Sequence, residues 1–184
     1  MPTTTNLALP YPGLTDAPNG PSAVQALAQA VDVLPGGLKA GNNMGTPASV
    51  AGNGTPSVGT TETRDAVLGN YGPFTAVTGR RYEVKLNNML SNGTVAGDMF
   101  IINVRNGGAS TPTAASPLAA TGSVYIAAAG GLGRTSAQVL GSFVPGAGTV
   151  TLGVFVVRAV GTGVYTPISA NVNRELYAVD VGPA

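Results

Sequence analysis

The sequence contains no cysteine and no histidine among its 184 residues. Without cysteine, disulfide bonds and thiolate metal sites are impossible. Without histidine as well, the Ser-His-Asp and Cys-His arrangements of nucleophilic catalysis are excluded, and so are most zinc sites. A pair of carboxylates is the remaining candidate for catalytic chemistry, and we expect neither a cofactor nor a bound metal.

Charged residues are also scarce, at 9% of the chain, and the formal net charge is +1. Soluble domains usually carry about a quarter of charged residues. This chain therefore offers no basic field to hold nucleic acid and no acidic field to steer cations. A net charge near zero instead favours association with neighbouring molecules.

Long apolar runs are missing too. A membrane span needs about 18 consecutive apolar residues, and no such run occurs. The first residues lack the basic region and apolar stretch of a secretion signal, so we expect no signal peptide and no membrane contact.

Acidic residues are few and scattered. They are Asp16, Asp32, Glu62, Asp65, Glu83, Asp98, Glu175 and Asp180. None forms a tight cluster such as a calcium loop. Glu62 and Asp65 flank Arg64, a pattern that indicates a solvated strand edge. A two-carboxylate glycosidase stays open as a third class of function, with Asp98 and Glu175 as the residues to test.

Glycine is abundant, and it clusters where turns are expected. The clusters 130–135, 144–149 and 161–163 lack the spacing and the following helix of a phosphate-binding loop, so they indicate turns. The pairs Asn53-Gly54, Asn92-Gly93 and Asn106-Gly107 are typical of tight turns. The first two pairs precede threonine, but without a secretion signal we interpret them as turns rather than glycosylation sites.

The N-terminal segment, residues 1–37, predicts an extended arm followed by one short amphipathic helix. Pro10 and Pro12 favour extended backbone on either side of Tyr11. The apolar side chains of the arm are Leu7, Leu9, Tyr11 and Leu14. A flexible linker is the alternative, although linkers rarely carry so many leucine and tyrosine residues.

The helix has a clear start and end. Asn19 or Gly20 can cap it, Pro21 suits its first position, and Pro35 ends it. One face carries Val24, Leu27, Ala28, Val31 and Leu34. A helix this short needs a surface to lie on, which can be the chain's own β domain, its symmetry mates or a larger assembly.

Residues 62–184 predict an antiparallel β-sandwich of the jelly-roll type, joined to the helix by a Gly/Asn/Thr-rich linker over 38–61. Apolar residues alternate with polar ones in this region. The inward positions are Tyr82, Val84 and Leu86, then Phe100, Ile102 and Val104, then Val150, Leu152, Val154 and Val156. Weaker strands are expected at Val124–Ile126, at Val139–Phe143 and at Leu176–Val181. Phe155 and Val157, on the reverse of a core strand, predict burial on both faces.

Two groups of motifs lie near the ends of the chain. The first is Leu9-Pro10-Tyr11-Pro12, Thr15-Asp16-Ala17-Pro18-Asn19-Gly20-Pro21, Gln25-Ala26-Leu27-Ala28 and Val31-Asp32. The second is Arg80-Arg81-Tyr82, Gly148-Thr149-Val150-Thr151-Leu152, Gly161-Thr162-Gly163 and Val179-Asp180-Val181-Gly182-Pro183. Together they resemble the virion proteins of tailed phages of actinobacteria, variously head decoration, head fibre or minor tail proteins. No motif covers residues 39–77.

The resemblance implies a non-enzymatic structural protein of the virion, assembled in the host cytoplasm. Such proteins are commonly trimers whose arm and helix attach to the particle. We therefore expect a capsid decoration protein of the head-fibre type that docks on the major capsid protein. The expected docking or oligomer contacts are Leu7, Leu9, Tyr11, Leu14, Val24, Leu27, Val31 and Leu34.

The alternative is a minor tail or receptor-binding protein that recognises host surface glycans. It needs aromatic side chains exposed on its surface. The candidates are Tyr71, Phe74, Tyr125 and Tyr165, although each also suits a place in the strand core.

Overall fold

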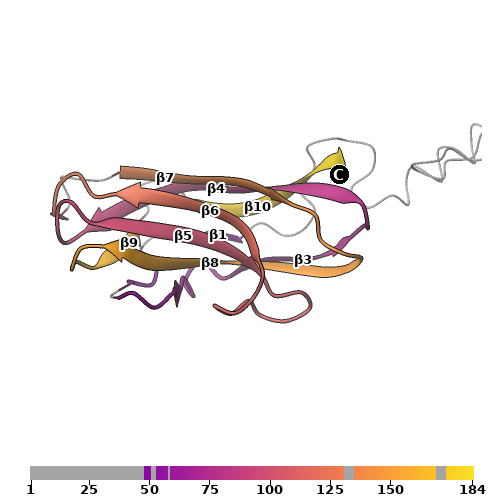
Figure 1. Cartoon of the computed structure of the whole chain (residues 1–184), viewed down its shortest axis with the longest axis horizontal. Helices are drawn as coiled ribbons and strands as arrows, with labels where there is room; N and C mark the ends of the chain where they lie inside the picture. The colour runs from indigo at the N-terminus through magenta and orange to yellow at the C-terminus, as the bar shows by residue number, and fades with distance from the viewer. Residues whose placement is uncertain (1–47, 51–52, 58, 131–134, 169–172) are drawn as a thin grey trace, which may run out of the picture. The chain divides into compact units, whose positions relative to one another are not determined.

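The computed structural model describes residues 48–50, 53–57, 59–130, 135–168 and 173–184. These residues form antiparallel strands in two sheets that face each other, with the strands of both sheets running in the same general direction (Figure 1). The predicted mainly β sandwich is confirmed. The predicted arm and helix lie outside the described residues. Within the described ranges, no helix is long and apolar enough to cross a membrane.

Sheet I has the strand order β1-β10-β4-β7, and β9 also pairs with β4. Its strands are β1 (Ala48–Val50), β4 (Arg80–Gly93), β7 (Thr135–Phe143), β9 (Tyr165–Ile168) and β10 (Arg174–Pro183). β9 lies on the same side of β4 as β10, because Leu90 and Ser91 pair with β7 on one side and β9 on the other. β1, which falls within the predicted linker, pairs with β10.

Sheet II has the strand order β2-β8-β5-β6, and β3 also pairs with β8. Its strands are β2 (Thr63–Arg64), β3 (Asn70–Ala76), β5 (Met99–Asn106), β6 (Leu118–Tyr125) and β8 (Gly148–Val160). β8 is the centre of this sheet, since it pairs with β2 and β3 on one side and with β5 on the other.

The core between the sheets is built from the alternating positions that the sequence predicts. All ten predicted inward residues of β4, β5 and β8 are buried in it. Aromatic rings continue this core along its length, with Tyr71 edge-on to Phe74 at 5.8 Å and Phe74 tilted against Tyr82 at 5.3 Å between ring centres. Such ring pairs add to the stabilisation that the buried area provides.

The Asn-Gly pairs do not all form the tight turns that the sequence predicts. Asn106 ends β5 and starts a turn, because its Oδ1 accepts a hydrogen bond from the N–H of Gly108, which has a φ of 65°. The turn predicted at Asn92-Gly93 is wrong, since both residues lie in β4 and pair with β9. A Cβ on Gly93 would lie 2.5 Å from the side chain of Ile126. Glycine at position 93 therefore serves close packing rather than a turn.

A segment before β3 crosses from one sheet to the other. We call residues 53–57 and 59–66 the crossing segment. Near its start, Gly54 donates its N–H to β9 in sheet I (N···O 2.7 Å), and Ser57 exchanges two backbone hydrogen bonds with the same strand. Near its end, β2 and Asp65 pair with β8 of sheet II. The crossing segment therefore links the two sheets along one side of the sandwich.

Candidate functional site

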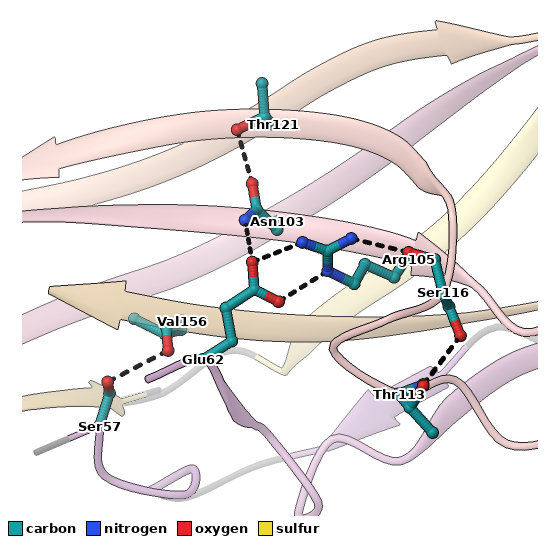
Figure 2. Close-up of polar contacts among 8 residues, drawn as sticks. All are labelled: Ser57, Glu62, Asn103, Arg105, Thr113, Ser116, Thr121 and Val156. Atoms are coloured by element: carbon teal, nitrogen blue, oxygen red, sulfur yellow. Dashed lines mark hydrogen bonds and ion pairs between the residues drawn. The ribbon is translucent and has the colours of Figure 1, made fainter. Parts of the chain in front are cut away.

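The outer face of sheet II carries a connected group of polar side chains. Asn103 and Arg105 lie at alternate positions of β5 and point away from the core, because the neighbouring Ile102 and Val104 are buried in it. Thr121 of β6 stands opposite Asn103 in the strand register. Asn103 and Arg105 contact Glu62, which comes from the crossing segment, and Thr121 contacts Asn103 (Figure 2).

Hydrogen bonds join the group into one network (Figure 2). Arg105 donates from Nε to Glu62 Oε2 (2.6 Å) and from Nη2 to Glu62 Oε1 (2.7 Å). Asn103 Nδ2 donates to the same Oε1 at 2.5 Å, and Thr121 Oγ1 donates to Asn103 Oδ1 at 2.7 Å. Arg105 also donates to the carbonyl oxygen of Ser116 in the β5–β6 loop. The network thus ties together the crossing segment, two strands and a loop.

The charges in this network stabilise each other. Hydrogen bonds from Arg105 hold the pKa of Glu62 below its usual range against the opposite effect of burial, and Asn103 acts in the same direction. The same contact raises the pKa of Arg105. A carboxylate held in its ionised form is a poor general acid, so this arrangement suits a structural role or the presentation of fixed polar groups.

Beneath the network lies Phe155 of β8. Its side chain points away from the core, since Val154 and Val156 belong to the core cluster, yet it is only 3% exposed. The predicted burial on the reverse face is confirmed for Phe155, whereas Val157 is only partly buried. The ion pair of Glu62 with Arg105 joins residues on the two sides of β8, and we infer that it covers this ring.

The β5–β6 loop also folds onto this face. Pro112 is buried, and its Cγ lies 3.3 Å from the position that a Cβ would take at Gly153 of β8. One end of the outer face is therefore covered by the chain itself, while the end near the start of β5 is open.

Tyr125 marks the open end of this face. It ends β6, is 58% exposed, and stands opposite Met99 of β5, which in turn pairs with the exposed Val160 of β8. The other three aromatic candidates for ligand contact, Tyr71, Phe74 and Tyr165, are buried in the core. Tyr125 is thus the member of that set with an exposed ring.

The sequence predicts a solvated strand edge at Asp65, and this prediction is wrong. Its side chain and that of Arg174 at the start of β10 are both fully buried, with Nη1 donating to Oδ2 at 2.6 Å. Asp65 Oδ1 also accepts hydrogen bonds from the N–H groups of Thr55 and Leu68. A Cβ at Gly54 would overlap both charged side chains, so glycine there leaves room for the pair. The turn predicted at Asn53-Gly54 is replaced by this close approach.

Asp98 and Glu175 lie in different parts of the sandwich. Asp98 is buried before β5 and accepts a hydrogen bond from the N–H of Gly163 in the β8–β9 connection (2.5 Å). Glu175 lies in β10 of the other sheet, opposite Asn87. Among the residues that the structure describes, no group of three acidic side chains is placed to hold a metal ion.

The eight predicted docking residues of the arm and helix all lie outside the described residues. The network around Glu62 was not predicted as a site. Its signal in the sequence is the pair of polar residues Asn103 and Arg105, which occupy alternate outward positions of the mostly apolar strand β5. The partner of Arg105 comes from a distant segment, which a strand pattern does not indicate.

Comparisons with known proteins give little further information. No family model matches the chain, and no curated protein matches it. Among solved structures it is similar to the CBM22-1–GH10 modules of endo-1,4-β-D-xylanase 10B from Clostridium thermocellum, complexed with xylohexaose. That match has a TM-score of 0.32 and 13% sequence identity, and it covers 56% of this chain and 17% of that chain. A TM-score this low does not establish a shared fold.

Proposed function

We propose that this chain is a non-enzymatic structural protein of a phage virion. In this proposal it is a capsid decoration protein of the head-fibre type, assembled in the host cytoplasm as a homotrimer. Its N-terminal segment docks on the major capsid lattice and its β-sandwich is displayed outward. The observation that carries the proposal is the resemblance at both ends of the chain, above all the Leu9–Pro12 and Thr15–Pro21 motifs.

The strand pairing supports a jelly roll as the finer topology. When the two short strands β2 and β9 are left aside, the eight others pair as β1–β10, β3–β8, β4–β7 and β5–β6. Along the chain, each of these pairs encloses the next. This is the pattern of one long hairpin of eight strands that folds over into two sheets. Two further pairs, β10–β4 and β8–β5, then complete the sheets.

The state of the carboxylates supports a structural role. Glu62, Asp65 and Asp180 each accept a hydrogen bond from a guanidinium, and Asp98 accepts one from a backbone N–H. Buried carboxylates used in this way hold strands and loops together.

Immunogold labelling of intact particles with antibody against residues 62–184 tests the proposal. Gold over the head supports a decoration protein. Gold only at the tail tip replaces it with a tail protein. Unlabelled particles, in a lysate that contains the protein, contradict the virion assignment. Since the chain carries few charges, attachment is expected to persist from low to moderate salt.

A second candidate function is recognition of host surface glycans by a minor tail or receptor-binding protein. The exposed ring of Tyr125 beside Met99 and Val160 favours it, because a flat apolar surface with polar neighbours suits a sugar ring. We expect Tyr125→Ala to abolish binding of the full chain to a glycan array. Leu140→Ala is the matched control, since Leu140 is equally exposed but lies on sheet I. Equal binding by both variants contradicts a site at Tyr125.

A further inference from the structure

The outer edge of sheet II lacks the usual protection against strand addition. β6 is the last strand on that side and pairs with β5 alone in the part of the chain that the structure describes. Edge strands usually carry lysine or proline to prevent addition of another strand. β6 reads Leu-Ala-Ala-Thr-Gly-Ser-Val-Tyr, with no charge and no proline. This edge is therefore suited to pairing with a further strand.

The backbone groups that face this edge can be identified. Ile126, directly after β6, donates its N–H to Asp98 O (2.9 Å) and accepts from Gly97 N–H (2.8 Å), both on the β5 side. Because strand residues alternate in the side to which they hydrogen-bond, Thr121 and Ser123 direct their N–H and C=O groups to the open edge. Their side chains lie on the outer face, and both residues are exposed.

The N-terminal arm has a sequence pattern that suits pairing with the open edge of β6. Residues 7–12 read Leu-Ala-Leu-Pro-Tyr-Pro. In an extended strand, Leu7, Leu9 and Tyr11 share one hydrogen-bonding side and one face, so their three N–H groups and three apolar side chains act together. Pro10 and Pro12 fall at the alternate positions, where a strand that ends a sheet needs no donor. The segment can therefore pair on one side and stop further addition on the other.

We propose that residues 7–12 of a second copy of this chain add to the edge of β6 as its outermost strand. Leu7, Leu9 and Tyr11 then pair with the edge-facing groups of β6. Their side chains lie on the same outer face as Tyr125. Both partners are uncharged, since residues 1–15 and β6 contain no acidic or basic side chain. The pairing is an intermolecular β-strand addition, and it leaves the predicted helix residues Val24, Leu27, Val31 and Leu34 for docking on the capsid lattice.

The position of β1 favours the arm of a second copy over the chain's own arm. The residues before the sandwich join it at β1, at one end of the sheet I order. β6 lies next to β7, at the other end of that order, where a Cβ on Gly141 would be 2.6 Å from Ala120. To reach β6, the chain's own arm would have to pass around the sandwich, whereas the arm of a neighbouring copy need not. Residues 13–47 can span about 110 Å when extended, so their length permits either arm, and the place where they join the sandwich favours the neighbour's.

A cysteine cross-link tests this pairing, because the natural chain has no cysteine. A full-length Leu9→Cys chain is mixed with a Ser123→Cys chain and oxidised. We expect a covalent dimer that contains one chain of each kind. Ala8→Cys mixed with Ser123→Cys is the matched control, and we expect at least a fivefold lower yield because Ala8 faces the opposite side. Equal yields for positions 8 and 9 overturn the proposal, and so does the absence of a cross-link. A single chain that carries both Leu9→Cys and Ser123→Cys tests the chain's own arm. A cross-link that forms only within that doubly substituted chain also overturns the proposal.

A pair of proline variants provides a second test that leaves the sandwich untouched. Leu9→Pro removes a donor on the pairing side, whereas Ala8→Pro adds a proline on the side already occupied by Pro10 and Pro12. We expect sedimentation to show at least tenfold weaker self-association for Leu9→Pro and unchanged association for Ala8→Pro. Equal effects of the two variants contradict the proposal. Both tests use the isolated protein, so their failure leaves the proposed place in the virion unaffected.

Discussion

The two long sides of the sandwich are held together by different means. On one side the crossing segment runs from β9 to β8, and it supplies Asp65 and Glu62 to the two ion pairs described above. On the other side β6 and β7 meet through small residues, with Gly141 facing Ala120, and within the described residues no ion pair joins these two strands. One side depends on directional polar contacts and the other on close apolar packing.

This difference separates two tasks. Buried polar contacts have strict geometry, so the side with the crossing segment fixes how the sheets are placed. Close packing of small residues leaves the outer backbone groups of β6 open to another strand. The side with fewer polar contacts is therefore the side where we expect assembly.

The largest effect is expected at the buried ion pair. Asp65→Ala leaves the fully buried guanidinium of Arg174 without its counter-charge, and among the described residues its Nε and Nη2 have no hydrogen-bond partner. Removing one partner of a buried pair costs about 3–5 kcal/mol. We expect a loss of that size in the free energy of unfolding, measured by urea denaturation.

The control for this prediction removes both charges. Asp65→Leu combined with Arg174→Met is expected to be less destabilised than Asp65→Ala, because no uncompensated buried charge remains. A single variant as stable as the parent contradicts the assignment of this pair as the main polar link between the sheets.

A smaller effect is expected on the side of β6 and β7. Gly141→Ala places a methyl group against Ala120, and overpacking of this kind costs about 1–3 kcal/mol. Thermal unfolding measures the loss. Gly146→Ala is the matched control, because no atom lies within 4 Å of the added Cβ. Ala120→Gly should restore stability to Gly141→Ala, and its failure to do so contradicts a steric cause.

Alternation was sufficient to predict the sandwich and its core. The ten inward residues of β4, β5 and β8 are buried as predicted, since a strand in a two-layer sheet structure must direct every second side chain inward. The topology was not settled by the pattern, because pairing between distant strands depends on contacts that a local pattern does not contain.

The polar contacts were the part that the sequence did not reveal. Asp65 looks like a surface residue beside Arg64, but its partner Arg174 is more than a hundred positions away in the chain. Gly54 and Gly93 look like turn residues, yet each provides room for a side chain from elsewhere. In each case the same local sequence suits two roles, and the tertiary neighbour decides between them.

The next effect in size concerns Glu62 and its dependence on pH. The pKa of Glu62 is lowered in the folded protein from an ordinary value of 4.5, so its contribution to stability is complete above that pH. It is lost as the pH falls through the lower folded-state pKa. We expect Glu62→Gln to cost about 1–2 kcal/mol at pH 7, and we expect this cost to shrink progressively as the pH falls below 4.5. A cost that does not change between pH 7 and pH 3 contradicts the role of the ionised carboxylate.

The smallest effect is expected for the pair of Glu83 with Lys85 on the outer face of sheet I. Their side chains are 36% and 32% exposed, respectively, and Lys85 Nζ lies 3.2 Å from Glu83 Oε2. Both residues belong to β4. Exposed pairs of this kind contribute about 0–1 kcal/mol and are screened by salt. Glu83→Gln should therefore change the free energy of unfolding by less than Glu62→Gln in the same buffer. An equal loss in the free energy of unfolding from the two variants contradicts this order. It would show that the contact of Glu62 with Asn103, and the link from the crossing segment to β5, add no stability beyond that of an exposed ion pair.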